Sequence, residues 1–315
     1  MFLSFIIPVY NCERLIGRCI ESIECQDFND FEVILINDGS KDNSFLVCQD
    51  LSKRYDNIKV LTQENKGASS ARNAGLKVAQ GEYVWFVDAD DYISDGIVKT
   101  LYSQSLTNNC DAYAMNYKYI TIGKETDILL YSEDADVKSV DYLHNSPCMF
   151  AATKVYKKVA LKGLQFQEGL TNIEDFLFNI LFLSSIESIH TLPVVGYVYD
   201  NTNQQSTSRN RDKKHLEKLS NNSIEVHRII NEFLQTYPQN KMRDVIVNLL
   251  NYSITGHIYS LLRFYTPDRL KEVVSWYKRH NLYPIGKTGK KRADIARFFF
   301  NRYGLLMLVS NFRNL

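Results

Sequence analysis

Hydrophobic positions follow two alternating patterns along the first 110 residues of the chain. Short runs rich in branched apolar side chains predict strands at 4–9, 31–37, 58–61 and 82–87. Between these runs, apolar residues recur three and four positions apart, which predicts helices that each bury one face. Alternating strands and helices are typical of a parallel sheet covered on both sides, so we expect an α/β fold.

The pattern changes in the rest of the chain. Positions 111–200 mix short strands with a strongly apolar helical stretch at 174–185, and we assign them to the same α/β domain. From position 210 onward, long segments with helical spacing and many charges follow one another. We therefore expect an α/β domain at 1–209 and a helical C-terminal region at 210–315.

Composition narrows the classes of protein to consider. The 37 Lys and Arg residues balance 36 Asp and Glu residues, so no overall field attracts nucleic acid, and we expect no such partner. No apolar run reaches the ~18 uninterrupted residues of a membrane-spanning helix.

The six cysteines form no C-x-x-C pair, and the first apolar run is typical of a strand rather than a secretory leader. Reduced thiols and a cytoplasmic location are expected, and the six scattered histidines are expected to be structural.

An unusual acidic cluster follows directly behind the apolar run YVWFV: Asp88, Asp90 and Asp91. Neighbouring carboxylates repel one another, so a positively charged partner is expected there. Asp88 and Asp90 point to the same side of an extended segment, and Mg²⁺ or Mn²⁺ often binds one or two carboxylates together with phosphate oxygens. A divalent cation carrying a diphosphate is therefore predicted. The alternative is that Asp91, Ser94 and Asp95 cap the helix that follows.

Two other predicted strands lead into polar motifs. Asp38 in NDGS can accept hydrogen bonds from a ribose or a base, although an ordinary Asp-Gly turn would look the same. Gly67 precedes a helix that carries Arg72, so backbone N–H groups and a guanidinium could face one anionic ligand. The alternative is a surface arginine beside a tightly packed helix. Because ligands of open α/β sheets bind at the carboxyl ends of strands, these motifs together predict a nucleotide site.

Taken in order, these motifs resemble those of family-2 inverting glycosyltransferases with the GT-A fold. The resemblance implies a Rossmann-like, mixed but mainly parallel sheet flanked by helices, with a C-terminal helical appendage. It continues more loosely to position 178, and further to 204–208. The motifs that carry it are PVYN at 8–11, NDGS at 37–40, NKGASSARNAG at 65–75 and DADD at 88–91.

The resemblance also implies roles for individual residues. Asp90 would be the principal ligand of Mn²⁺ or Mg²⁺, with Asp88 beside it. Glu174 and Asp175 match an acidic motif whose aspartate deprotonates the acceptor hydroxyl, although acids also favour the first turn of a helix for electrostatic reasons. Ser206 and Ser208 either contact phosphates or close a loop. The implied donor-nucleotide contacts are Pro8, Val9, Tyr10, Glu13, Asp38, Gly67, Arg72 and Asp88.

The expected activity is transfer of a sugar, with inversion, from a nucleotide-sugar donor to a glycan or lipid-linked saccharide in polysaccharide biosynthesis. Uridine is favoured as the base by the resemblance alone. A sugar nucleotidyltransferase or a dehydrogenase would need a glycine-rich loop after the first strand, which PVYN does not provide. A catalytically silent nucleotide-sugar-binding module would not need Asp175. Ala151 and Ala152 stand where relatives commonly carry an aromatic residue, so the acceptor cannot be inferred.

The C-terminal segment at 287–315 joins basic and apolar residues. A helix of this composition can lie in the interface of an anionic membrane, here on its inner face. The alternatives are that it packs on the α/β domain or on a second subunit of a homodimer. The basic residues are Lys287, Lys290, Lys291, Arg292 and Arg297, and the apolar residues are Phe298, Phe299, Phe300, Leu305, Leu306, Met307 and Leu308.

Overall fold

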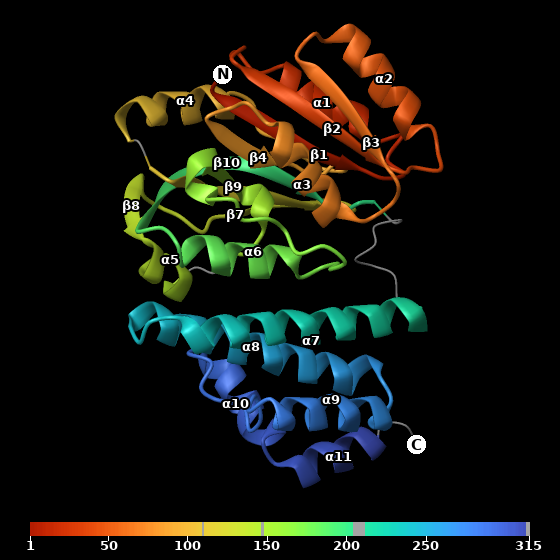
Figure 1. Ribbon diagram of the computed structural model, residues 1–315, viewed down its shortest axis with the longest axis vertical. Coiled ribbons are helices and arrows are strands. Elements are labelled where there is room, and N and C mark those ends of the chain that lie inside the picture. Colours follow the sequence, from red (N-terminus) through yellow and green to blue (C-terminus); the bar gives the residue numbers. More distant parts are fainter. Residues whose placement is uncertain (109, 146–147, 204–211, 313–315) are drawn as a thin grey trace. The chain divides into compact units, whose positions relative to one another are not determined.

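The computed structural model describes residues 1–108, 110–145, 148–203 and 212–312 (Figure 1). Contacts divide the chain into two units, Met1–Arg209 and Asn210–Leu315. Each unit has apolar residues buried in its own interior.

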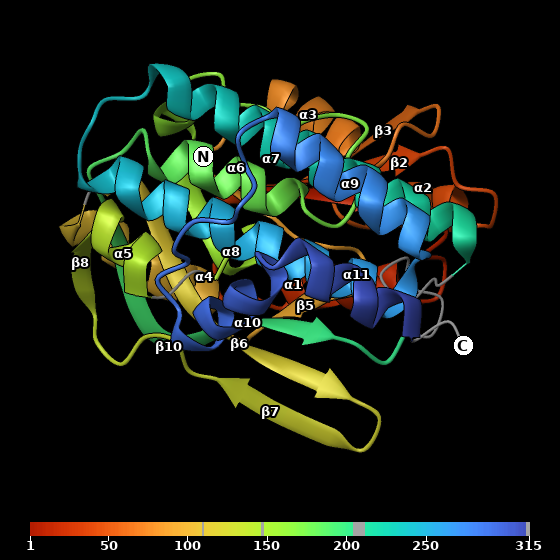
Figure 2. The ribbon, with the colours of Figure 1, turned by 90° about the horizontal axis from the view of Figure 1, so that it is seen from below.

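A mixed sheet forms the centre of the first unit. Its strands are β1 (Leu3–Val9), β2 (Phe31–Asp38), β3 (Ile58–Gln63), β4 (Tyr83–Phe86), β5 (Tyr92–Ile93), β6 (Ala112–Thr121), β7 (Lys124–Ile128), β8 (Ala135–Lys138), β9 (Lys154–Lys157) and β10 (Ser188–Asp200). The order is β3-β2-β1-β4-β9-β6-β10-β5, with β7 on β6 and β8 on β10. The strands from β3 to β4 pair in parallel, as do β6 and β10, whereas β9 joins both blocks antiparallel. Figure 2 shows the hairpin of β6 and β7.

Helices cover both faces of this sheet. They are α1 (Ile16–Glu24), α2 (Ser44–Arg54), α3 (Ala68–Val78), α4 (Ile97–Thr107), α5 (Ser139–Asn145) and α6 (Glu174–Leu183). On one face, Ile20 of α1 shares a core with Phe5 and Trp85, whose rings stack with centroids 5.5 Å apart. On the opposite face, a Cβ at Gly75 of α3 would fall 2.5 Å from Ile6, so only glycine allows this close approach. The predicted α/β fold with helices on both faces is confirmed.

The strand order places two of the polar motifs side by side. From β1 the chain moves outward to β2 and β3, and then returns to β4 on the other side of β1. A crevice forms at the carboxyl ends of parallel strands where the order reverses in this way. The end of β1 at Val9 and the acidic cluster that follows β4 therefore meet at one edge of the sheet.

The second unit is helical in its described residues. Its helices are α7 (Lys213–Thr236), α8 (Lys241–Phe264), α9 (Pro267–Arg279), α10 (Lys291–Phe300) and α11 (Tyr303–Phe312). α8 packs against α7, α9 and α10, and Figure 1 shows α7, α8 and α9 running alongside one another. By length and composition alone, α8 could also cross a membrane, but 56% of its most apolar stretch is buried, as in the central helix of a bundle.

Candidate active site

The acidic cluster behind β4 forms a tight turn, which we call the acid loop (Asp88–Asp91). The N–H of Asp91 donates to the carbonyl of Asp88 (3.0 Å). The buried carboxylate of Asp91 accepts hydrogen bonds from the hydroxyl of Tyr197 and from the N–H of Asp200 (2.8 Å). α4 begins only at Ile97, without a side-chain cap. Asp91 therefore fastens the acid loop to β10, and helix capping does not account for the acidic run.

A cation that the sequence analysis missed lies beside the acid loop. The Arg18 guanidinium of α1 bonds Asp200 Oδ2 (2.5 Å) and donates to the backbone carbonyl of Asp90 (2.8 Å). It also lies 4.6 Å from the ring centroid of Tyr92. Its two hydrogen-bond partners are 182 and 72 positions away along the chain, so no local spacing marks Arg18.

Arg72 links the acid loop to the acidic pair of α6. Its guanidinium contacts Asp88 Oδ1 (2.8 Å), Glu174 Oε1 (3.2 Å) and Asp175 Oδ1 (3.5 Å). Only 6% of the side chain is exposed. Burial lowers the pKa of Arg72, but the charges of Asp88, Asp175 and Glu174 outweigh that effect and raise it. One buried cation thus brings three of the predicted site residues together, and we call these four residues the arginine network.

Asp175 is the most accessible member of the acidic pair. It lies in the first turn of α6, and 23% of its side chain is exposed. Asp175 Oδ2 accepts a hydrogen bond from the N–H of Ala151 (2.8 Å). Burial raises the pKa of Asp175 to about 6, with Glu174 and Asp88 adding to the rise and Arg72 opposing it. A carboxylate with this pKa is ionised at neutral pH and basic enough to accept a proton.

A buried lysine holds the segment that donates to Asp175. The ammonium of Lys154 donates to the carbonyls of Cys148 (2.7 Å) and Phe150 (3.1 Å). Asn179 of α6 donates to the carbonyl of Met149 (2.9 Å). These bonds hold the carbonyls of residues 148 to 150, directly before the Ala151 N–H that donates to Asp175.

Four aromatic side chains contact one another beside Asp175, and we call them the aromatic cluster: Tyr117 and Tyr119 of β6, Tyr199 of β10, and Phe150 of this segment. The rings of Tyr119 and Tyr199 stack (5.5 Å, 14°), as do those of Tyr199 and Phe150 (6.0 Å, 19°). Burial and then the carboxylates of the acid loop raise the pKa of Tyr199 to about 12, which places its hydroxyl near those charges. Phe150 is 47% exposed, so the cluster presents an aromatic surface next to Asp175.

A cleft of about 540 Å³ opens at the end of β1. Asn203, which lines it, also donates to Asp90 Oδ2 (3.4 Å), so the cleft borders the acid loop. Its acids are engaged by the chain: Glu13 accepts from Asn43 and Asp42 accepts from Ser44. Its cations are exposed. The full lining is Asn11, Cys12, Glu13, Arg14, Leu15, Lys41, Asp42 and Asn203.

The predicted nucleotide contacts at the end of β1 divide into two groups. Glu13 lines the cleft, and Tyr10 is exposed beside it. Pro8 is half-buried in β1. Val9 is fully buried in the apolar core, so its side chain does not reach the cleft. Residues 204–208, with Ser206 and Ser208, lie outside the described part of the chain.

Asp38 and Gly67 bind each other in the structure. The buried carboxylate of Asp38 accepts from Gln63 Nε2 (2.7 Å), from the N–H of Lys66 (2.9 Å) and from the N–H of Gly67 (2.8 Å). Gly67 adopts φ of 89°, a conformation that favours glycine. Asp38 thus shapes the loop before α3, and the Gly67 N–H that was expected to face an anion is already engaged. Nucleotide contact by Asp38, Gly67 or Arg72 stays a prediction.

Asp90 has the properties of a ligand for a divalent cation. Its carboxylate forms no ion pair with a described residue, and burial followed by the charge of Asp88 raises its pKa. Asp88 is compensated by Arg72. No group of three or more His, Cys, Asp and Glu in the described residues could hold a metal alone. Two carboxylates fit a Mg²⁺ or Mn²⁺ site that a substrate's phosphates complete.

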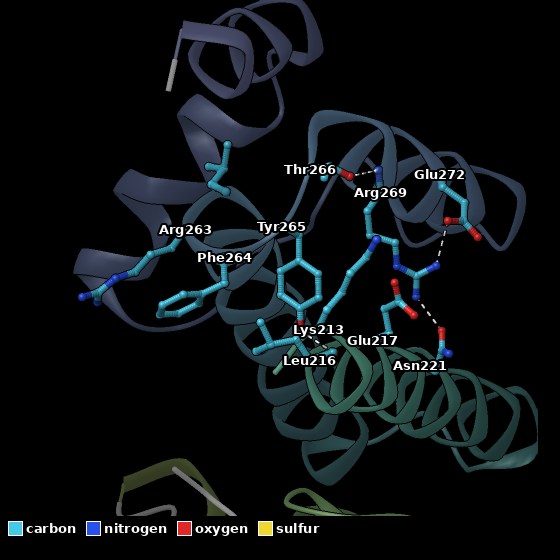
Figure 3. A pocket seen from close by; sticks show the side chains of 11 residues that line it. Lys213, Leu216, Glu217, Asn221, Arg263, Phe264, Tyr265, Thr266, Arg269 and Glu272 are labelled. Atoms are coloured by element: carbon cyan, nitrogen blue, oxygen red, sulfur yellow. Dashed lines mark hydrogen bonds and ion pairs between the residues drawn. The ribbon is translucent and has the colours of Figure 1, made fainter. Parts of the chain in front are cut away.

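A second hollow, of about 590 Å³, lies in the helical unit (Figure 3). The Arg269 guanidinium that points into it donates to Glu272 (2.7 Å), Asn221 and Ser220. The hydroxyl of Tyr265 donates to the carbonyl of Leu216 (2.6 Å). The terminal nitrogens of Arg269 and the hydroxyl of Tyr265 are therefore engaged by the chain, while Arg269 Nε is buried without a partner among the described residues.

The chain is similar to known proteins in both sequence and fold. The profile of the family described as "Glycosyl transferase family 2" matches residues 4–161. The uncharacterised glycosyltransferase EpsJ of Bacillus subtilis is 31% identical over 207 residues, which cover 62% of this chain and 60% of EpsJ. A Campylobacter jejuni enzyme, GalNAc(5)-diNAcBac-PP-undecaprenol beta-1,3-glucosyltransferase, is 31% identical over 60% of this chain and 62% of its own length. The chain therefore spans about three-fifths of these relatives.

A solved structure extends the likeness to both units. S. aureus TarS 1–349 in complex with UDP-GlcNAc aligns over 100% of this chain and 92% of that one, with a TM-score of 0.72 and 22% identity. At this identity the likeness shows the fold, including the C-terminal helical region.

Proposed function

The chain belongs to glycosyl transferase family 2, and on this premise we propose that it transfers one sugar from a nucleotide-sugar donor to a hydroxyl of an acceptor saccharide, with inversion. The observation that carries the proposal is the arginine network. Arg72 holds a carboxylate of the acid loop and the carboxylate of Asp175 at the same guanidinium. A donor site and a base are therefore adjacent, as a single displacement requires.

The cleft at the end of β1 is the proposed donor site. Exposed Arg14 and Lys41 at its edge suit a diphosphate, and Asp90 lies at its other side, bonded to Asn203. Asp90 and Asp88 would hold Mn²⁺ or Mg²⁺, which when bound would stabilise the negative charge on the departing diphosphate. Because the TarS structure contains UDP-GlcNAc, a UDP-sugar is the first donor to test.

Asp175 is the proposed general base. Its carboxylate takes the proton of the acceptor hydroxyl while that oxygen bonds to the anomeric carbon and the bond to the diphosphate breaks. The Ala151 N–H and Arg72 orient the carboxylate without neutralising it, because its pKa of about 6 leaves it ionised at neutral pH. A single displacement from the face opposite the leaving group inverts the anomeric carbon.

The aromatic cluster is the proposed contact for the acceptor sugar. Phe150 is exposed, belongs to the segment that Lys154 holds, and precedes the residue that donates to Asp175. Sugar rings present C–H faces that pack on aromatic rings. The names of relatives include an enzyme acting on a GalNAc(5)-diNAcBac-PP-undecaprenol saccharide and a poly(ribitol-phosphate) beta-glucosyltransferase, so an acceptor of cell-surface polysaccharide type is proposed.

The acceptor contact has a kinetic test. Phe150→Ala should raise the KM for the acceptor about three- to tenfold while the KM for the donor is unchanged, because a lost ring contact costs a small free energy. Phe150→Trp should restore the acceptor KM. Leu106→Ala on α4, which removes an apolar side chain that is even more exposed, is the control. Equal acceptor KM in Phe150→Ala and the parent protein would remove Phe150 from the acceptor site.

Donor binding is tested by calorimetry with UDP-sugars, with and without Mn²⁺. Asp90→Asn should abolish the Mn²⁺-dependent part of the affinity without lowering the melting temperature, because it removes a carboxylate that its neighbours repel. Asp95→Asn is the control. It removes an exposed charge just before α4, and the variant should bind donors as the parent does. Equal affinity of Asp90→Asn and the parent would refute the metal assignment, and failure of every nucleotide sugar to bind the parent would refute the donor site.

A further inference from the structure

An apolar surface remains uncovered on the last two helices. Five large side chains there are between 39% and 56% exposed, and we call them the C-terminal apolar face. Phe300 and Leu306, which the sequence analysis grouped with them, are buried. The outward side of a helix in a water-soluble bundle is normally polar, so an exposed apolar patch marks an interaction site. The five residues are Ile295, Phe298 and Phe299 of α10, and Leu305 and Val309 of α11.

The exposure of α10 results from firm anchoring on its other side. Phe300 is buried, and its carbonyl accepts from the hydroxyl of Tyr283 (2.7 Å). Asn301 accepts from the N–H of Ile285 (2.7 Å) and donates to the carbonyl of the same residue (2.9 Å). Positions 295, 298 and 299 share one side of the helix, because they are three and four residues apart. The anchored helix therefore holds that side outward.

Positive charge surrounds the C-terminal apolar face. Lys287, Lys291, Arg292 and Arg302 are exposed, and the Arg302 guanidinium lies 4.1 Å from the ring centroid of Phe298. From 287 to 312 the sequence contains one acid, Asp294, and it is already paired with Arg297 (2.6 Å). Long basic side chains beside apolar ones are the composition of helices that lie in the interface of an anionic bilayer.

We propose that the C-terminal apolar face inserts into the interface of an anionic lipid bilayer, with the surrounding lysines and arginines on the lipid headgroups. The positive charge around this face favours a bilayer over a second copy of the chain as its partner. A second copy of this chain would bring the same cations together, whereas anionic headgroups attract them and the acyl region takes up the phenylalanine rings. The inference rests on the second unit alone and is independent of the proposed transfer reaction.

Co-sedimentation of the full chain with vesicles tests this proposal. Vesicles with equal parts of phosphatidylglycerol and phosphatidylcholine should bind the parent protein, and pure phosphatidylcholine vesicles should bind at least about tenfold less. Phe298→Ser with Phe299→Ser should weaken binding to the mixed vesicles by about tenfold or more, because two rings that would insert into the bilayer are lost. Lys291→Gln with Arg292→Gln should weaken it by about fivefold for each charge and flatten its salt dependence.

Matched controls make the outcome decisive. Tyr252→Ser with Tyr259→Ser removes two equally exposed aromatic rings from α8 and should bind as the parent does. Far-ultraviolet dichroism and melting temperature establish that each variant is folded, and the charge pair tests the proposal even if the phenylalanine pair unfolds. If the parent protein does not co-sediment with vesicles that contain phosphatidylglycerol, the proposal is overturned. It is also overturned by a parent that sediments as a dimer and becomes a monomer in the phenylalanine variant, because the face would then be a protein interface.

Discussion

The buried polar network of the first unit is built from charged side chains, whereas that of the second unit is built from neutral ones, with one cation, Arg269, hydrogen-bonded at its edge. In the first unit, Arg72 is surrounded by Asp88, Glu174 and Asp175. In the second, two buried histidines are joined through the hydroxyl of Tyr277, which lies 2.8 Å from Nδ1 of His227 and 2.6 Å from Nδ1 of His257. We call the second arrangement, with Ser220 and Ser253, the histidine network.

Every ring nitrogen in the histidine network has a partner. Nε2 of His227 lies 2.8 Å from Ser253 Oγ, and Nε2 of His257 lies 3.0 Å from Ser220 Oγ. A neutral imidazole supplies one donor and one acceptor, and a hydroxyl supplies both, so the chain of bonds can be satisfied without any charge. Burial lowers the pKa of both histidines, that of His257 to about 3. The sequence had shown these histidines as scattered, and the fold brings them together in a structural role.

The arginine network is built less favourably for stability. Arg72 Nε and Glu174 Oε2 are buried without a hydrogen-bond partner in the described residues. Each buried unsatisfied polar atom costs about 1–3 kcal/mol. Asp90 adds a like-charged neighbour to the same region. Unpartnered buried atoms also occur in the second unit, at His215 Nε2 and Arg269 Nε. What distinguishes the first unit is the crowding of carboxylates around one cation where chemistry is proposed, whereas burial keeps the two histidines of the second unit neutral.

The largest expected effect is on catalysis. Asp175→Asn should lower the transfer rate by about 10²–10⁴-fold, because a positioned general base contributes an acceleration of that size. Donor affinity measured by calorimetry should stay at the parental value. In the parent, kcat/KM should fall as pH drops below about 6, since the base must be ionised and its pKa lies there.

Two controls accompany that prediction. Glu168→Gln removes an exposed charge on the segment before α6 and should leave the rate unchanged. Turnover of Asp175→Asn at the parental rate would exclude Asp175 as the base. If the parent protein binds donors but transfers no sugar, the chain is better described as a nucleotide-sugar-binding module.

The next largest effect is on stability. Arg72→Ala should lower the free energy of unfolding by about 3–5 kcal/mol, because it leaves buried carboxylates without their cation. Asp88, Glu174 and Asp175 then also lose their common partner, and transfer activity should be lost with it. Urea titration measures the first effect and a transfer assay the second.

Lys77→Ala is the matched control for Arg72. Lys77 is exposed on the same helix, α3, and its removal should change stability by less than about 0.5 kcal/mol. An Arg72→Ala protein as stable as Lys77→Ala would show that the arginine network does not hold the first unit together.

The smallest expected effect is the loss of stability of the second unit at low pH, which the buried histidines of the histidine network cause. His257 is protonated more readily in the unfolded chain, where its pKa is near 6.5, than in the folded chain, where it is about 3. The unfolded state therefore binds more protons below pH 6.5, and stability falls as pH falls, by up to about 1.4 kcal/mol per pH unit for each such histidine. His227 acts in the same direction. Hydrogen exchange of the α8 amides in the full chain measures this slope.

His257→Gln should reduce the dependence of stability on pH by the contribution of one histidine, which is up to about 1.4 kcal/mol per pH unit. It should also lower stability at neutral pH. His144→Gln, at an exposed position of α5 in the first unit, should leave the slope of α8 unchanged. A slope that is the same in His257→Gln and the parent would mean that His257 does not titrate on unfolding.

Local patterns were enough to predict much of the fold and part of the site. The apolar runs predicted β1, β2, β3 and β4 and the helices between them, because burial on both faces requires near-continuous apolar strands. The motif behind β4 predicted the acidic cluster of the acid loop, and the resemblance to family-2 glycosyltransferases pointed to Glu174 and Asp175, which begin α6. Arg18 escaped prediction, because its partners are far away in the chain.

By itself, the sequence determined which segments become strands and helices and which residue types stand at their ends, because periodicity and turn chemistry are local properties. Tertiary structure alone decided how those ends are used. It turned Asp38 inward to the loop before α3, buried Arg72 among three carboxylates, and set Phe150 beside Asp175. Such contacts depend on the strand order β1-β4-β9 and on chain segments up to 103 positions apart, and no local pattern encodes that distance.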